Sequence, residues 1–163
     1  MRIGQGFDAH RLVAGRPLVL AGVAIPHDRG LEGHSDGDVV LHAVASALFG
    51  ALGEGDLGRH FPPSDESLEG LDSRRIVERA MRIVVERGYR VGNLDCTVIA
   101  QEPGLAPHQA AMTESVAGLL DAELGRVNLQ VTSTDRLGTI GRGEGIAGLA
   151  VVLLEPDEGS GRD

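Results

Sequence analysis

The chain has 163 residues, a formal net charge of −9 and no lysine, so all 15 of its basic residues are arginines. Its length suits one compact domain, and its acidic balance argues against nucleic-acid binding, which usually relies on a basic stripe. The absence of lysine excludes a Walker-A phosphate loop and any lysine Schiff base.

The first 70 residues predict a strand, a hairpin and one helix before a long loop. Arg2 to Asp8 is expected to form the strand, and residues 17–26 carry the hairpin pattern. Ser35 is interpreted as the cap of a helix that continues to about Leu52, because apolar residues recur there at helical spacing. The segment 53–70 is rich in glycine, proline and aspartate, and a loop of this length is often functional.

The second half of the chain predicts helices alternating with strands. A helix over 73–87 has apolar residues along one side and Gly88 placed to end it. The remaining elements are a strand over 91–101, a helix over 107–120, and strands over 127–133 and 146–154. The last segment, 156–163, has the composition of a disordered tail.

This order of elements predicts an α+β domain over residues 1–155, with helices packed on one face of a mixed sheet of about four strands. The single cysteine, Cys96, excludes an internal disulfide and fits a reducing cytoplasm. The N-terminal segment lacks the apolar core of a signal peptide. No stretch approaches the roughly 20 apolar residues of a membrane span. We therefore expect a cytoplasmic protein with no membrane partner.

Asp8 and His10 are two residues apart on the first predicted strand, so their side chains point to the same face. His42 lies in the following predicted helix. Taken singly, an Asp-x-His triplet is more often a surface pair, and a histidine among apolar residues is more often a hydrogen-bonded core residue. If the three converge, they provide three ligands and leave one coordination position open, which is the arrangement of a catalytic zinc site.

The loop over 53–70 holds a second group of candidates: Asp56, Gly58, Phe61 and Asp65. One interpretation is a solvated cluster of turns. The other is a lid whose Asp56 carboxylate and backbone amides hold a polar substrate. The residues alone leave both interpretations open.

A third group, Thr132 to Asp135, follows a predicted strand and precedes the glycine-rich segment 141–145, which contains Arg142. Hydroxyls and a carboxylate at a strand end can bind magnesium and phosphate oxygens, and a glycine-rich turn lets backbone N–H groups approach an anion. The alternative is a β-hairpin with glycine turns. The same segment matches a dinucleotide-binding spacing, which we reject because a strand follows it where that motif needs a helix.

Six stretches carry most of these candidates in order: RIGQGFDAHR, LEGHSDGDVVLHA, GDLGRHFPPSD, DSRRIV, GNLDCTVIAQEP and TSTDRLGTIGRGEGIA. Together they resemble the 2-C-methyl-D-erythritol 2,4-cyclodiphosphate synthase family over nearly the whole chain. The resemblance implies conversion of 4-diphosphocytidyl-2-C-methyl-D-erythritol 2-phosphate to the cyclic diphosphate, with release of CMP, in non-mevalonate isoprenoid synthesis. It also implies a homotrimer with active sites between subunits and a cytidine-diphosphate-linked substrate.

Position by position, the resemblance implies a zinc ion held by Asp8, His10 and His42, and a magnesium or manganese ion at Asp135. It implies catalytic roles for His34 and Ser133. The residues that it implies for substrate binding are Asp8, His10, His34, Ser35, Asp56, Gly58, Phe61, Asp65, Ala100, Pro103, Ala106, Thr132, Ser133, Thr134, Asp135, Thr139 and Arg142.

The sequence departs from the family pattern at several of these positions. Asp135 stands where the family usually has glutamate, and Ser133 stands where threonine is usual; both keep the functional group. Ala106 replaces a larger residue of the cytosine pocket. Thr139 and Leu149 replace phenylalanine and glutamate that face a central cavity of the trimer, where some members hold an isoprenoid diphosphate.

Two other classes of function remain open from the residues. A metal-dependent phosphohydrolase would use the same two cations but release inorganic phosphate. A non-catalytic trimeric metal-binding module would leave the segments 53–65 and 100–106 without a purpose. Stronger thermal stabilisation by cytidine nucleotides than by adenine nucleotides would favour the cyclase.

Overall fold

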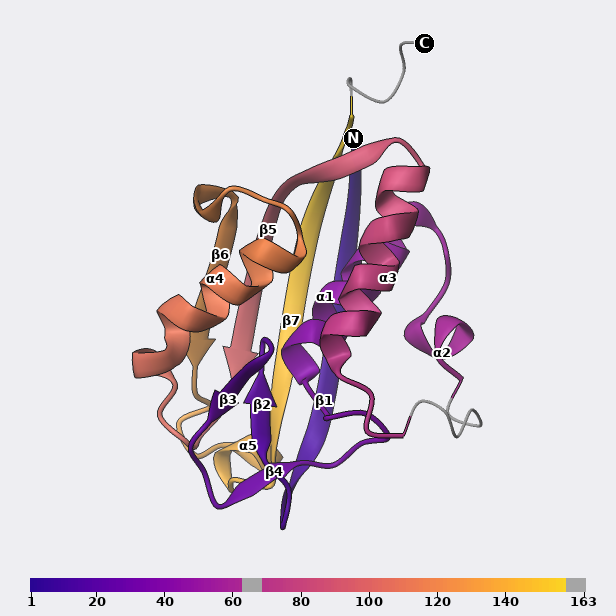
Figure 1. Cartoon of the computed structure of the whole chain (residues 1–163). Coiled ribbons are helices and arrows are strands. Elements are labelled where there is room, and N and C mark those ends of the chain that lie inside the picture. The colour runs from indigo at the N-terminus through magenta and orange to yellow at the C-terminus, as the bar shows by residue number, and fades with distance from the viewer. Residues whose placement is uncertain (63–68, 158–163) are drawn as a thin grey trace.

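The computed structural model describes residues 1–62 and 69–157. Within these residues, five strands form one twisted sheet in the order β4-β1-β7-β5-β6 (Figure 1). Their bounds are β1 Arg2–Ala14, β4 Arg29–Leu31, β5 Tyr89–Ile99, β6 Val127–Thr132 and β7 Gly145–Pro156.

The sheet is mixed, as predicted: β5 and β6 run parallel, while β1 pairs antiparallel with β4 and β7, and β7 pairs antiparallel with β5. The predicted number of about four strands is wrong, because the sheet in the described residues also contains β4. A three-residue strand is too short to show the alternation of apolar and polar residues by which strands are recognised. The predicted hairpin forms a separate pair, β2 Leu18–Leu20 with β3 Val23–Ile25.

The three long helices lie on one face of the sheet, in front of it in Figure 1. They are α1 Val39–Leu52, α3 Ser73–Glu86 and α4 Gln109–Leu119. Short helical turns complete the described residues: α2 Leu57–His60, η2 Ala106–His108, η3 Leu124–Arg126 and α5 Gly138–Gly141. The segment 53–70 was predicted as a loop, and α2 corrects that prediction for residues 57–60. The predicted glycine turn follows α5, where Gly143 has a φ angle of 69°.

The two faces of the sheet differ sharply in burial. Alternate residues of β7, from Ile146 to Leu154, are buried under the helices. On the opposite face, Ile3, Phe7 and Val151 are 72%, 63% and 40% exposed. In the register of the sheet these apolar side chains are neighbours, because Phe7 pairs with Leu149 and Gln5 with Val151.

The C-terminal strand is longer than predicted. β7 continues to Pro156, which pairs with Tyr89, and the Asp157 N–H donates to the Gly88 carbonyl at 2.9 Å. Pro156 and Asp157 therefore do not belong to the predicted tail, and residues 158–163 of that tail lie outside the described residues. Among the residues that are described, no helix combines the length and apolarity needed to cross a bilayer.

Candidate metal centre and active site

Asp8 and His10 lie on the face of β1 that is turned toward α1, as their spacing predicts. The His10 Nε2 atom is 2.9 Å from the Asp8 Oδ2 atom, and both side chains are about a quarter exposed. β1 runs on to Ala14 and does not end at Asp8, so both residues are held in the middle of a paired strand.

Glycines on the sheet allow α1 to lie unusually close to these residues. A Cβ atom at Gly6 would come within 2.0 Å of the Ala43 carbonyl oxygen, and one at Gly4 within 1.9 Å of the Ala47 carbonyl oxygen. Real Cβ atoms do not approach backbone atoms so closely. The glycines of β1 therefore set the distance between the strand and the helix, and Ala43 directly follows His42.

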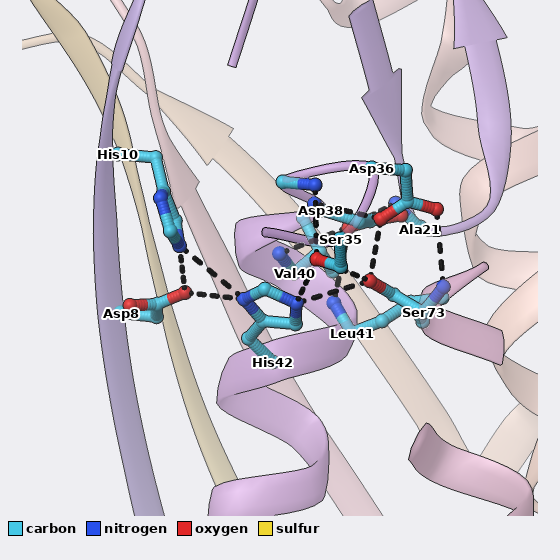
Figure 2. A network of polar contacts seen from close by, with 11 residues as sticks. Asp8, His10, Ala21, Ser35, Asp36, Asp38, Val40, Leu41, His42 and Ser73 are labelled. Atoms are coloured by element: carbon cyan, nitrogen blue, oxygen red, sulfur yellow. Dashed lines mark hydrogen bonds and ion pairs between the residues drawn. The ribbon is translucent and has the colours of Figure 1, made fainter. Parts of the chain in front are cut away.

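His42 reaches Asp8 and His10 from α1 (Figure 2). Its Nδ1 atom lies 2.8 Å from the Asp8 Oδ2 atom and 3.3 Å from the His10 Nε2 atom. The three ligand atoms all lie within 4.8 Å of one another. The predicted convergence of the three side chains is confirmed, although 32 residues separate His10 from His42.

The electrostatics of the triad keep Asp8 ionised beside the two imidazoles. Burial by itself would raise the pKa of the Asp8 carboxyl, but hydrogen bonds with His10 and His42 outweigh it and hold that pKa below its ordinary value. The hydrogen bond to Asp8 raises the pKa of His10. One carboxylate oxygen and two imidazole nitrogens form a donor set that suits zinc, with room for a further ligand.

The start of α1 is fixed by Asp38, and not by Ser35 as predicted. The Asp38 carboxylate accepts the N–H groups of Val40 and Leu41 at 3.1 Å each, so the helix begins at Val39. The same buried carboxylate accepts the N–H groups of Ala21 and Gly22 in the turn of the hairpin. The cap therefore also ties α1 to β2 and β3.

Ser35 is buried and faces His42 instead. Its hydroxyl oxygen accepts the Gly37 N–H at 3.1 Å and lies 3.0 Å from the His42 Nε2 atom. The Arg16 guanidinium donates to the carbonyls of Gly33 and Ser35, which holds this loop in place.

A cavity of about 270 Å³ opens beside the triad. Its lining combines predicted site residues from four separate segments of the chain with apolar side chains of α2 and α3. The lining residues are Asp8, His10, His34, Ser35, His42, Leu57, Gly58, Phe61, Pro62, Leu71 and Ile76.

The loop predicted as a lid enters this cavity through Gly58 and Phe61, but Asp56 has a different role in the described structure. Its carboxylate accepts the Arg59 N–H at 2.9 Å and caps α2. Asp65 lies outside the described residues. Gly58 and Phe61 therefore line the cavity, whereas a lid and a contact of Asp56 with substrate stay predictions.

The third predicted group lies at the ends of β5 and β6. The Ala100 N–H donates to the Thr132 carbonyl at 2.9 Å, which brings the segment after β5 beside the segment after β6. Asp135 and Arg136 have φ angles of 50° and 65°, in a left-handed region that non-glycine residues rarely adopt. The Arg136 N–H donates to the Gln101 Oε1 atom at 2.9 Å, which ties this unusual turn to the neighbouring segment.

The other residues of this group are largely exposed, and their contacts are with residues only two or three positions away in the chain. Thr134 donates to the Leu137 carbonyl, and the Ser133 hydroxyl is 3.4 Å from the Asp135 carboxylate. The Arg142 guanidinium is paired with Glu144 at 2.6 Å. Pro103 follows β5 in the chain, Ala106 begins η2 and Thr139 lies in α5.

Within the described residues, the third group, Thr132 to Asp135, does not line the cavity of the metal triad. β7 and β5 stand between β1 and β6 in the sheet, so three strand spacings, or about 14 Å, separate them. One copy of the chain therefore does not bring the metal triad and the segment Thr132 to Asp135 together in one site.

Two polar residues beside His42 were missed as site residues. Asp36 and Ser73 lie within the quoted stretches LEGHSDGDVVLHA and DSRRIV, but their side chains meet only in the folded chain. A serine at the first position of a helix is normally interpreted as a local capping residue. No local pattern indicates that its hydroxyl reaches a histidine 31 residues away.

Fold and site together define an α+β protein with a candidate catalytic divalent-metal centre between a β-strand and a helix. The chain belongs to the YgbB family, whose model matches residues 1–155.

Relatives in this family carry one shared description. A protein of Geobacillus sp. (strain WCH70), described as 2-C-methyl-D-erythritol 2,4-cyclodiphosphate synthase, is 54% identical over 154 residues, covering 94% of this chain and 98% of that protein. A solved structure of such a synthase in its CDP-bound form is 37% identical, with a TM-score of 0.87, and the match covers 94% of this chain and 100% of that chain. The Plasmodium falciparum IspF–CDP complex is 29% identical, with a TM-score of 0.85, covering 96% and 97% of the two chains.

Proposed function

We propose that this chain is a 2-C-methyl-D-erythritol 2,4-cyclodiphosphate synthase of the non-mevalonate isoprenoid pathway. Its substrate is 4-diphosphocytidyl-2-C-methyl-D-erythritol 2-phosphate. An oxygen of the 2-phosphate attacks the β-phosphorus, the bond from that phosphorus to the α-phosphate oxygen breaks, and CMP leaves. The observation that carries the proposal is the Asp8–His10–His42 triad beside a cavity, in a chain whose relatives bear this description.

The triad is proposed to hold zinc, and Asp135 is proposed to bind magnesium or manganese together with the substrate. When bound, such cations supply Lewis-acid polarisation of phosphate oxygens and offset their charge. The chain's own contribution is positioning, because the nucleophile belongs to the substrate. His34 and Ser35 line the cavity, where a ring N–H and a hydroxyl can donate to phosphate oxygens.

The erythritol portion is proposed to lie against Gly58 and Phe61, with Asp56 and Asp65 accepting from its polar groups. The cytidine portion is proposed to contact Ala100, Pro103 and Ala106. The second half of the site is completed by Thr132, Ser133, Thr134, Asp135, Thr139 and Arg142. The two solved relatives with bound CDP support a cytidine nucleotide as part of the substrate.

The active site is proposed to form between neighbouring copies in a homotrimer. The apolar side chains of Ile3, Phe7 and Val151 on the uncovered sheet face support burial against other copies of this chain. A site divided between subunits also explains why β1 and β6 residues stand apart within one chain. The protein is further proposed to act in the cytoplasm, in line with a buried cysteine that has no disulfide partner.

Light scattering is expected to give a mass three times the 17.1 kDa of one chain. Phe7→Asp places a charge on the apolar face, so it is expected to yield monomers with turnover reduced at least about 100-fold, because each site loses the half that a neighbour contributes. Gln5→Asp, a charge on the same face at an already polar position, is a milder control. A fully active Phe7→Asp monomer would contradict the divided site.

Phosphorus NMR of the products tests the function directly. Incubation with the proposed substrate, zinc and magnesium is expected to produce a cyclic diphosphate and CMP in equal amounts. Release of orthophosphate would instead identify a phosphohydrolase. Zinc binding without any turnover would leave the metal-binding module as the remaining function.

Asp135→Ala is expected to lower turnover about 100-fold at low magnesium, because a carboxylate ligand of the second cation is lost. Raising magnesium is expected to recover part of that loss, whereas zinc content stays at the wild-type value. Asp135→Glu, which keeps the carboxylate, is the matched control. A magnesium dependence of Asp135→Ala equal to that of the wild type would remove Asp135 from this role.

A further inference from the structure

The His42 imidazole also makes polar contacts on the side that faces away from Asp8 and His10. Its Nε2 atom lies 3.0 Å from the Ser73 hydroxyl and 3.0 Å from the Ser35 hydroxyl (Figure 2). Ser73 is fully buried and Ser35 is 8% exposed. These contacts are made by different elements: Ser73 opens α3, whereas Ser35 lies in the loop before α1.

Asp36 determines which way the hydroxyl of Ser73 points. The Ser73 hydroxyl donates to the Asp36 Oδ1 atom at 2.5 Å, and the Ser73 N–H donates to the Asp36 Oδ2 atom at 3.1 Å. A hydroxyl has a single hydrogen. Since that hydrogen is directed to a carboxylate, the Ser73 oxygen presents a lone pair to His42.

The direction of this bond determines where the proton of His42 lies. Facing a lone pair, the Nε2 atom must carry the hydrogen, which it shares between the Ser73 and Ser35 oxygens. In a neutral imidazole, hydrogen on Nε2 leaves the Nδ1 lone pair free for a cation, which then takes the place of the hydrogen that Nδ1 would otherwise donate to the Asp8 carboxylate. Nδ1 is the atom that faces Asp8 and His10.

We propose that Asp36 and Ser73 are positioning residues that orient His42 and hold it in the Nε2–H tautomer, so that Nδ1 is available to a divalent cation. The proposal rests on the metal site of the proposed function. Hydrogen-bonding partners of this kind typically change metal affinity 10- to 100-fold when they are removed. Asp36 and Ser73 do not themselves contact the cation.

The same contacts connect metal binding to the docking of α3. The Asp36 N–H donates to the Leu71 carbonyl at 3.1 Å, and the Gly70 N–H donates to the His34 carbonyl at 2.6 Å. The segment 69–73 is therefore joined by backbone hydrogen bonds to the loop that carries His34 and Ser35. The orientation of a metal ligand on α1 thus depends on a helix 31 residues further along the chain.

Zinc affinity measured by chelator competition tests the proposal without relying on turnover. Ser73→Ala is expected to weaken zinc binding about 10- to 100-fold, since the orienting acceptor is lost. Asp36→Asn changes almost no volume but lets the amide donate to Ser73, whose hydroxyl can then donate to Nε2. That reversal favours hydrogen on Nδ1, so a similar loss of affinity is expected.

Ser46→Ala removes a hydroxyl one turn further along α1 and is expected to bind zinc as the wild type does. Nitrogen-15 NMR of the imidazoles is expected to find hydrogen on Nε2 of His42 in the wild type. Zinc affinities of Asp36→Asn and Ser73→Ala within twofold of the wild type, or a His42 Nε2 atom without hydrogen, would overturn the proposal. If Ser73→Ala fails to fold, Asp36→Asn decides. A wild-type protein that binds no zinc would refute the metal site itself.

Discussion

His42→Ala is expected to abolish zinc binding and to reduce turnover at least about 100-fold, the scale of losing a preorganised electrostatic contact. The His42 side chain is 8% exposed and provides the only ligand of the triad that comes from α1. Asp8 and His10 remain on β1, but two ligands hold zinc far more weakly than three. The fold is expected to survive, because alanine is the best helix former and α1 is buried along most of its length.

Metal content after dialysis, circular dichroism and phosphorus NMR of the products are the three measurements needed. His108→Ala is the matched control for metal content, since it removes a histidine from η2 and is expected to keep one zinc ion per chain. One zinc ion per folded His42→Ala chain would show that the triad is not the metal site.

Gly6→Ala is expected to damage both stability and metal binding. The added methyl group would lie 2.0 Å from the Ala43 carbonyl oxygen and 2.7 Å from the Ala47 N atom, so α1 must move away from β1. Such overpacking typically costs about 1–3 kcal/mol of unfolding free energy, and a clash with backbone atoms belongs at the upper end. The same movement draws His42 away from Asp8, so zinc affinity is expected to fall as well.

Gly50→Ala is the control from the same interface. Its added methyl group would lie 3.6 Å from the Gln5 carbonyl oxygen, which is an ordinary contact. In a helix this change is expected to leave stability equal or to raise it by up to about 1 kcal/mol. Urea unfolding and chelator competition measure the two effects. If Gly6→Ala matched the wild type in both, the close approach of α1 to β1 would not control the site.

Local sequence patterns predicted well those helices and strands whose buried residues recur at one regular spacing. The helix over 73–87 was located to within one residue because Ile76, Val77, Ala80 and Val84 recur at its spacing and are buried. The strand at the start of the chain was recognised but cut short at Asp8, because the polar residues of the site interrupt the alternation. Three-residue β4 and four-residue α2 carry too few residues for any periodicity.

The cap of α1 shows a different kind of error. Ser35 and Asp38 are both good capping residues, and local chemistry does not choose between them. Asp38 caps the helix because the turn at Ala21 and Gly22 directs two more N–H groups toward its carboxylate. That leaves Ser35 to face His42. A contact across 17 residues decided the outcome, and a sequence pattern does not contain it.

The sequence by itself determined that Asp8 and His10 share a face, since side chains on a strand alternate with a period of two. It also determined the chemistry available to the site, two imidazoles and a carboxylate without any lysine. Only the tertiary structure decided that His42 comes within 2.8 Å of Asp8 and that Ser73 comes within 3.0 Å of His42. Those distances depend on how closely α1 packs against β1 and α3 against α1. Such packing is set by groups far apart in the chain, above all the backbone contact at Gly6.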